Sequence, residues 1–218
     1  MSLTDILDAR HSCRAYLDTP VPDDVIEQLF ALAQKTPSWC NTQPWQAYVT
    51  SGESTQKLGD ALLERAGLGD PAPDVEWPPG YPDVYGERRR ESGYALYAAL
   101  GIERSDYAAR TDAANLNLHF FGAPHTAIIT TAAALGTYGA VDCGGYVAVL
   151  ALAAQELGLG AIPQAAIAAY SDVVRAQLSI PEEQHILCAV SFGYEDTKHV
   201  VNSFRTSRAP LAETLHRV

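Results

Sequence analysis

The spacing of apolar residues along the chain predicts a series of amphipathic helices. The clearest follows Pro22, where apolar residues recur three and four positions apart on one face and two aspartates favour the positive end of the helix dipole. Pro37 ends this pattern, because proline cannot continue a helix. The same reasoning predicts helices over residues 3–10, 54–66, 84–100, 104–119 and 142–157, and one that begins at Ser171 and ends before Pro181.

Three runs rich in β-branched and aromatic residues predict strands. They cover residues 47–51, 126–131 and 185–194, and the second, "TAIITT", is the most strand-prone run in the chain. Helices and strands are interspersed, but too few strand–helix–strand units repeat for a doubly wound sheet. The order therefore favours an α+β fold, with a modest sheet packed among helices.

Residues 67–86 interrupt this order. Five prolines stand there among glycine, aspartate and aromatic residues, so the segment is neither a regular helix nor a central strand. A long irregular segment is typical of a lid or a linker, and the aromatic content favours an ordered lid. We place the lid at about residues 68–110, within a single domain that covers residues 1–218 and ends in a tail at 195–218.

Composition and charge exclude some classes of function. The formal net charge of −11 argues against binding to nucleic acid or to an anionic membrane, because both need a dense positive field. The four cysteines lie far apart and suit neither a zinc site nor a disulfide framework, and no histidines show metal-binding spacing. Charged residues interrupt the first ten positions, so no signal peptide is predicted and we expect a reduced, cytoplasmic protein.

Motifs of other enzyme classes find no support. The glycines of "GLGA" follow a predicted helix rather than a strand, so a helix C-cap at Gly158 explains them better than a dinucleotide-binding loop. There is no Gly-x-Ser-x-Gly or Ser-x-x-Lys motif for a nucleophilic serine. Cys40 has no indicated partner histidine, and we expect it to fill a tight loop.

Two clusters of arginine and serine lie near the two ends of the chain. Arg10, Ser12 and Arg14 stand where the first helix ends, and Arg205 and Arg208 stand in the tail. Guanidinium groups donate in a planar fork to pairs of oxygen atoms, so clustered arginines suit a phosphate or another polyanion. Each cluster alone is more typical of surface salt bridges. Together, in an acidic chain, they predict one anionic ligand held by both ends of the chain.

Four motifs resemble those of the FMN-dependent nitroreductases. They are "RHSCRAYLDTPVP", "TPSWCNTQPWQAYV", "AQELGLGAIPQAAI" and "GYEDTKHVVNSFRTSRAPL". They occur in family order over nearly the whole chain, and the first two together are the most specific. The resemblance implies a nitroreductase-like fold with a mixed central sheet surrounded by helices. It also implies an intertwined homodimer, in which the C-terminal tail extends to the partner subunit.

The resemblance further implies a function. Such a protein holds FMN, accepts hydride from NADH or NADPH at flavin N5 and passes it, in a ping-pong cycle, to a nitroaromatic or quinone-type acceptor. No side chain then needs to act as a catalytic acid or base. Two alternatives stay open. The same fold and cofactor also suit reductive dehalogenation, activated-alkene reduction or flavin breakdown, and a flavin-binding dimer without turnover is the second alternative.

The matched motifs also imply the residues of a cofactor site. Arg10, His11, Ser12 and Arg14 would form the first cluster, with Arg10 and Arg14 binding the FMN phosphate and the polar edge of the flavin, and Arg205 and Arg208 would complete the phosphate site. Arg14 is the candidate for the flavin N1 region. Pro163, Gln164, Ala165 and Ala166 would lie along the isoalloxazine ring. Ser38 and Asn41 would reach the flavin of the partner subunit.

Substrate contacts are expected in the lid. The aromatic residues Trp77, Tyr81, Tyr85, Tyr94 and Tyr97 could stack on a planar substrate, although tyrosines at these positions equally suit the packing of a dimer surface.

The chain departs from the family pattern at a few positions. His11 stands where arginine is common, and Tyr146 stands where glutamine is frequent on the long helix. Cys13 and Cys40 replace small or aliphatic residues, which suggests sensitivity to oxidation.

Overall fold

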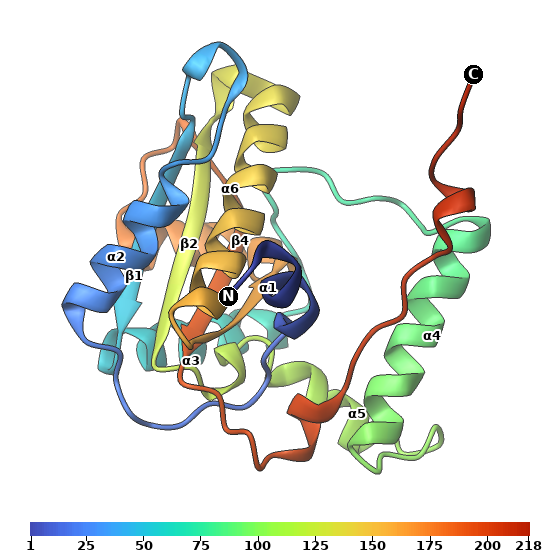
Figure 1. Ribbon diagram of the computed structural model, residues 1–218. Helices are drawn as coiled ribbons and strands as arrows, with labels where there is room; N and C mark the ends of the chain where they lie inside the picture. The colour runs from blue at the N-terminus through green and yellow to red at the C-terminus, as the bar shows by residue number, and fades with distance from the viewer.

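The computed structural model describes residues 1–218 and is built around one four-stranded sheet (Figure 1). Its strands are β1 (Trp45–Ser51), β2 (His125–Ala132), β3 (Gly160–Gln164) and β4 (Gln184–Gly193), in the spatial order β1-β2-β4-β3. The three predicted strands are confirmed, and β3 was not assigned from the sequence. It contains Gly160 and Pro163, which are poor strand formers, and it lies at the edge of the sheet, where proline is tolerated.

The expectation of a mixed sheet is wrong for these four strands. Every neighbouring pair is antiparallel. The reason is the position of β4, which comes last in the chain and lies between β2 and β3. Strands β2 and β3 run parallel to each other, but β4 lies between them and pairs antiparallel with both. A single bridge between Ser12 and Ala161 adds a parallel contact at the free edge of β3.

Helices cover both faces of the sheet. On one face, α2 (Asp23–Ala33) packs against α6 (Gly136–Glu156), and both bury apolar residues against the strands. On the other face, α3 (Glu53–Gly67) and α7 (Ser171–Leu178) form a second apolar cluster with strand residues such as Ile128. The alternation of side chains along β2 explains this division, because successive residues of a strand point to opposite faces.

Helix α6 begins six residues before its predicted start. Gly136 and Gly139 are poor helix formers, so helix propensity did not predict the first turn, although Gly139 has a packing role. A Cβ atom there would lie 2.7 Å from Thr131 Oγ1, so the glycine lets the helix approach β2 closely. At the other end Gly158 follows the helix with φ of +74°, which confirms the C-cap interpretation.

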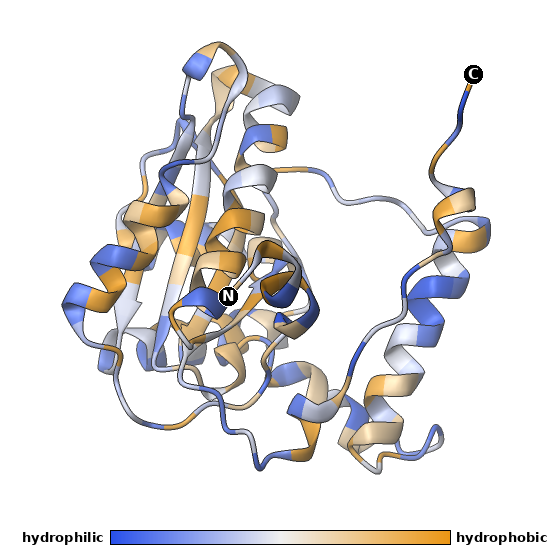
Figure 2. Ribbon diagram, viewed as in Figure 1, coloured by the Kyte–Doolittle hydropathy of each residue, from blue (hydrophilic) through white to orange (hydrophobic).

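Helix α6 is rich in apolar residues. With the turn before it, α6 is the only helix that is long and apolar enough to cross a membrane. It packs against α2 and the sheet through Cys143, Tyr146 and Leu150, as a core helix does, and Tyr146 stacks on Trp45 at a centroid distance of 4.8 Å. Figure 2 shows the concentration of apolar residues on α6 and β2.

Helices α4 (Asp83–Ala99) and α5 (Tyr107–Asn115) follow the irregular segment and stand apart from the sheet, with the tail running alongside α4 (Figure 1). An ion pair of 2.8 Å between Arg88 and Glu213 ties the tail to α4. The structure shortens α5 at both ends relative to the prediction, because Asp106 caps its start and turns follow its end. The first helix, α1 (Leu3–Ala9), begins with a capping box at Ser2.

Candidate functional site

The two arginine clusters meet in space. The segment after α1 and the C-terminal tail together enclose a pocket of about 340 Å³. Its lining contains every member of the two predicted clusters, with one acidic residue, Asp8, beside them: Arg10, His11, Ser12, Arg14, Arg205 and Arg208. Residues that lie almost 200 positions apart in the sequence therefore form one positively charged site.

The four arginines of this pocket have no ion-pair partner. None has a carboxylate oxygen within 4.0 Å, whereas Arg65, Arg88 and Arg175 elsewhere in the chain each do. Burial lowers the pKa of Arg10, and repulsion from Arg208 and Arg205 lowers it further. Burial also lowers the pKa of Arg14. The surplus of positive charge argues against the salt-bridge alternative and leaves the pocket suited to an anion.

Asn202 joins the two ends of the chain. It is buried, and its Oδ1 accepts a hydrogen bond of 2.8 Å from the backbone N–H of Arg14. Its Nδ2 donates to the carbonyl oxygens of Ala15 at 2.8 Å and Asp196 at 3.0 Å. The tail is thus bonded to the segment that carries Arg14, which places Arg205 opposite the first cluster.

His11, a member of the first cluster, is engaged by other residues of the chain. Its Nε2 lies 3.0 Å from Glu195 Oε1, and its Nδ1 lies 3.1 Å from the carbonyl oxygen of Ala9. Both ring nitrogens therefore face protein acceptors rather than the pocket. Although His11 lines the pocket, it acts there mainly as a second link between the first cluster and the start of the tail.

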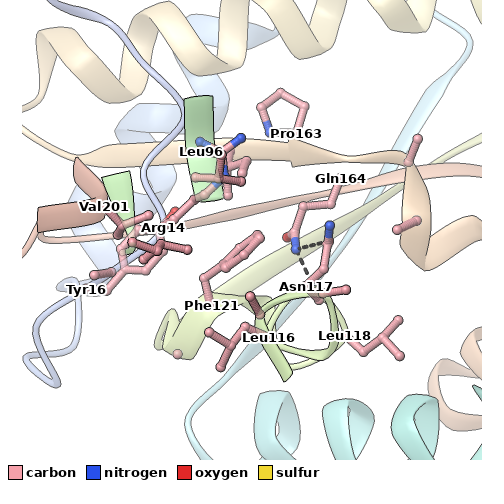
Figure 3. A pocket seen from close by; sticks show the side chains of 18 of the residues that line it. Arg14, Tyr16, Leu96, Leu116, Asn117, Leu118, Phe121, Pro163, Gln164 and Val201 are labelled. Carbon is pink, nitrogen blue, oxygen red and sulfur yellow. Dashed lines mark hydrogen bonds between the residues drawn. The ribbon is translucent and has the colours of Figure 1, made fainter. Parts of the chain in front are cut away.

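A larger cavity of about 830 Å³ adjoins the arginine pocket, and Arg14 lines both. The cavity is mainly apolar, and β3 with the turn after it supplies Pro163, Gln164, Ala165 and Ala166 along one side (Figure 3). The four residues predicted to lie along the flavin ring thus line one cavity, beside the predicted phosphate pocket. Together the two spaces suit a ligand with an apolar planar part and an anionic end.

Arg14 is held where the two spaces meet. Its guanidinium donates a hydrogen bond of 3.1 Å to the carbonyl oxygen of Ser12. The guanidinium carbon lies 5.9 Å from the ring centroid of Phe121 and 5.8 Å from that of Phe204, which are cation–π distances. The side chain is therefore fixed before any ligand arrives.

Gln164 fixes the side of the cavity. The buried amide donates from Nε2 to Asn117 Oδ1 and to the Asn117 carbonyl oxygen, both at 2.8 Å (Figure 3). Its Oε1 accepts a hydrogen bond from Ser191 of β4. These bonds join β3, β4 and the segment after α5, so the cavity wall around Gln164 is rigid.

The structure brings only some of the lid aromatics to this cavity. Trp77 and Tyr97 line it. Tyr81, Tyr85 and Tyr94 do not line it in their own chain, and Tyr81 instead lies under the guanidinium of Arg89 at 5.4 Å.

Ser38 and Asn41 lie in a loop that lines neither the cavity nor the arginine pocket. Ser38 Oγ accepts a hydrogen bond of 2.9 Å from the backbone N–H of Gln43. Cys40, Asn41 and Gln43 all have positive φ, and the rings of Trp39 and Tyr138 of α6 lie with their centroids 4.7 Å apart at an interplanar angle of 55°. The loop thus projects beside the outer face of α6.

The buried cysteines are not reactive thiols. Cys13 is fully buried beside Gly160, and burial raises its pKa to about 11. Cys13 is therefore poorly placed for oxidation, contrary to the expectation from its sequence position. Cys40 is exposed, so the expectation stands for that residue.

The sequence did not reveal the residues that support the site. Asn202 belongs to a matched motif but gave no sign of its bonds to both ends of the chain. Glu195 stands in the same motif and gave no sign of its bond to His11, and Asn117 and Phe121 were not singled out, because these roles depend on neighbours distant in sequence.

Comparison with known proteins finds relatives that match nearly the whole chain. Residues 7–194 match the nitroreductase family. Nitroreductase NfnB of Mycolicibacterium smegmatis is 36% identical over 210 residues, which cover 96% of this chain and 89% of that protein. The 4-nitrobenzoate reductase of Pseudomonas putida is 36% identical over 212 residues, which cover 94% of this chain and 92% of that protein. The crystal structure of the FMN-dependent nitroreductase NfnB from Mycobacterium smegmatis in complex with NADPH matches with a TM-score of 0.94 at 35% identity, covering 99% of this chain and 97% of that one.

Proposed function

This chain belongs to the nitroreductase family, and we propose that it is an FMN-dependent NAD(P)H oxidoreductase that reduces nitroaromatic or quinone-type acceptors. One observation carries the proposal. Four arginines without carboxylate partners surround a pocket that adjoins an apolar cavity of about 830 Å³. FMN has two matching parts, an aromatic ring system for the apolar cavity and a phosphate group for the arginine pocket.

The residues present fit this cofactor. Arg10, Arg14, Arg205 and Arg208 would hold the phosphate, because guanidinium groups bind phosphate oxygens in pairs. The strand β3 and its following turn would lie along the ring, with Pro163 and Ala165 exposed toward it. When bound, FMN supplies the redox chemistry, accepting hydride from NAD(P)H and passing electrons to the acceptor.

The protein's own contribution is to bind, orient and exclude water. Arg14 keeps a positive charge at the end of the cavity, where it would stabilise negative charge on a bound ring system. Gln164 holds β3 in place through its bonds to Asn117 and Ser191. Trp77 and Tyr97 extend the apolar lining, which keeps water from the ring and offers a surface for a planar substrate.

We further propose that the working unit is a cytoplasmic homodimer. The outer face of α6 exposes Tyr138 and Val141, and the loop with Ser38 and Asn41 lies beside it. A second copy packed on this surface would cover it and would bring the loop to the partner's cavity. The tail at 195–218 and the lid at about 68–110 would complete that interface.

Binding of FMN and riboflavin tests the assignment of the phosphate pocket. One charge-assisted hydrogen bond contributes about 1.5–3 kcal/mol, so two or more contacts predict that FMN binds at least ~100-fold more tightly than riboflavin. Arg205→Gln and Arg208→Gln should reduce this preference, whereas Arg89→Gln, outside the pocket, should not. Equal affinity for the two flavins would contradict the assignment.

A further inference from the structure

The irregular chain between α3 and α4 is fastened to the rest of the protein at its beginning. We call residues 70–81 the strap, and Figure 1 shows it as an extended segment that leads to α4. Ala72 N–H donates a hydrogen bond of 2.8 Å to the carbonyl oxygen of Ala169, and Asp74 N–H donates one of 3.3 Å to Ser171 Oγ. Residues 75–81 form no hydrogen bond, so Asp74 is the last residue that holds the strap in place.

The side chain of Asp74 makes the strongest of these contacts. Its Oδ2 accepts hydrogen bonds of 2.7 Å from Arg175 Nη2 and 2.8 Å from the backbone N–H of Ile186. The side chains of Asp74 and Arg175 are only 17% and 12% exposed, so solvent screens this ion pair weakly. Arg175 Nη1 donates in turn to the carbonyl oxygens of Pro181 and Gln184, at 2.6 and 3.1 Å. Asp74 therefore ties the strap to α7 and β4, which share the second apolar cluster.

The strap contacts the main cavity on both sides of Asp74. Pro71 and Trp77 line the cavity of about 830 Å³, whereas Asp74 itself does not. Three residues of chain reach at most ~10 Å, so the anchored Asp74 keeps Trp77 within that distance. Without this anchor the nearest tie would be at Ala72, five residues before Trp77, and the reach would grow to ~17 Å. The place of the half-exposed Trp77 at the cavity thus depends on Asp74.

We propose that Asp74 is a positioning residue for the acceptor site. Its bonds to Arg175 and to Ile186 N–H hold the indole of Trp77 at the cavity, where the indole contacts a bound planar substrate. The proposal rests on the proposed function and adds to the same site a residue that lies outside the cavity. Because Arg175 neutralises the Asp74 carboxylate, loss of Asp74 should weaken acceptor binding without adding or removing charge in the cavity.

Calorimetry of 4-nitrobenzoate binding tests this role without turnover, on the FMN-supplemented, oxidised protein in the absence of NAD(P)H. Asp74→Ala should raise the dissociation constant ~3- to 10-fold, which corresponds to one aromatic contact. The increase should disappear when Trp77→Ala is already present, because a double-mutant cycle isolates the interaction between two residues. A purely structural role of Asp74 would instead raise the dissociation constant equally with and without Trp77.

Two further variants make the result specific. Arg175→Lys takes the place of Asp74→Ala if that variant does not fold, because it keeps a positive charge beside Asp74. A single ammonium group cannot replace the fork that joins Asp74 to two carbonyl oxygens, so this variant should show the same Trp77-dependent increase. Glu182→Gln is the matched control, since Glu182 lies 3.5 Å from the same arginine but is exposed and lies outside the strap, and it should bind as the wild type does.

Two results would overturn the inference. One is a dissociation constant within ~2-fold of wild type in both Asp74→Ala and Arg175→Lys. The other is an increase of the same size in the Trp77→Ala background, which would show that Asp74 does not act through the indole.

The proposed function has a separate readout, the bleaching of the flavin absorption by NADPH or NADH without oxygen. It should occur in the wild-type protein and in Glu182→Gln. If neither nucleotide bleaches the flavin but the Trp77-dependent increase is found, the proposed function fails and the positioning role stands. If the flavin is bleached and the increase is not found, the positioning role fails and the function stands.

Discussion

Replacing Asn202 by alanine should loosen the connection between the two ends of the chain. The buried amide makes three hydrogen bonds, one from Arg14 N–H and two to the carbonyl oxygens of Ala15 and Asp196. Each such bond contributes about 1 kcal/mol net, so the three together stabilise docking of the tail by ~3 kcal/mol. At about 1.4 kcal/mol per factor of ten, the open population should rise ~100-fold.

Hydrogen exchange followed by mass spectrometry measures this population directly. Exchange of amides in a docked segment follows the equilibrium of local opening, so protection of residues 13–17 and 196–204 should fall by up to ~100-fold in Asn202→Ala. Protection of β2 should not change. Affinity for FMN should fall as well, because Arg205 loses its position opposite the first cluster.

Two control variants decide whether the reasoning is correct. Asn202→Asp keeps the acceptor for Arg14 N–H but sets a carboxylate oxygen against the carbonyl oxygens of Ala15 and Asp196, so it should open the tail at least as much as alanine. Ser203→Ala removes an exposed hydroxyl that bonds only to the carbonyl oxygen of Val200, and it should behave as wild type. Protection in Asn202→Ala within ~3-fold of wild type would refute the assigned role of Asn202.

Three further predictions follow from burial and exposure. Burial lowers the pKa of His125, so below about pH 6.5 the unfolded chain binds a proton that the folded chain does not. The free energy of unfolding in urea should therefore fall from pH 7.5 to 5.5, and it should fall less in His125→Gln; equal losses would contradict this. A charged maleimide should modify exposed Cys40 in the native protein but leave buried Cys13, whose pKa is raised to about 11, until denaturation; rapid native labelling of Cys13 would count against its burial. Tyr138→Glu combined with Val141→Glu should shift the protein from dimer to monomer in sedimentation velocity, and an unchanged dimer would exclude the outer face of α6 as the interface.

The elements that the sequence predicted are those whose pattern is local. Helix α2 has an apolar face between two prolines, and β2 is rich in β-branched residues, so both were identified with nearly correct bounds. The edge strand β3 was missed because its glycine and proline disfavour strands, and only pairing with β4 makes it one. The first turn of α6 was missed because it contains Gly136 and Gly139, and Gly139 is there for close packing against β2 rather than for helix propensity.

The residues of the candidate site are also of two kinds, those that a local sequence motif revealed and those that depend on tertiary contacts. The arginine clusters were visible as motifs, and their meeting in one pocket agrees with the prediction of a shared anion. The bonds of Asn202, the engagement of His11 by Glu195 and the rings around Arg14 arise only from tertiary contacts. No spacing in the sequence encodes them, so they could be found only in the folded chain.

Anaerobic titration of the purified protein with NADPH tests the central claim most directly. We expect that the protein carries or takes up FMN, that NADH or NADPH bleaches the flavin absorption, and that 4-nitrobenzoate or menadione then restores it. Absence of FMN binding, or bound flavin that neither NADH nor NADPH bleaches, would contradict the proposed function. The second result would favour the alternatives of another flavin reaction or of flavin binding without turnover.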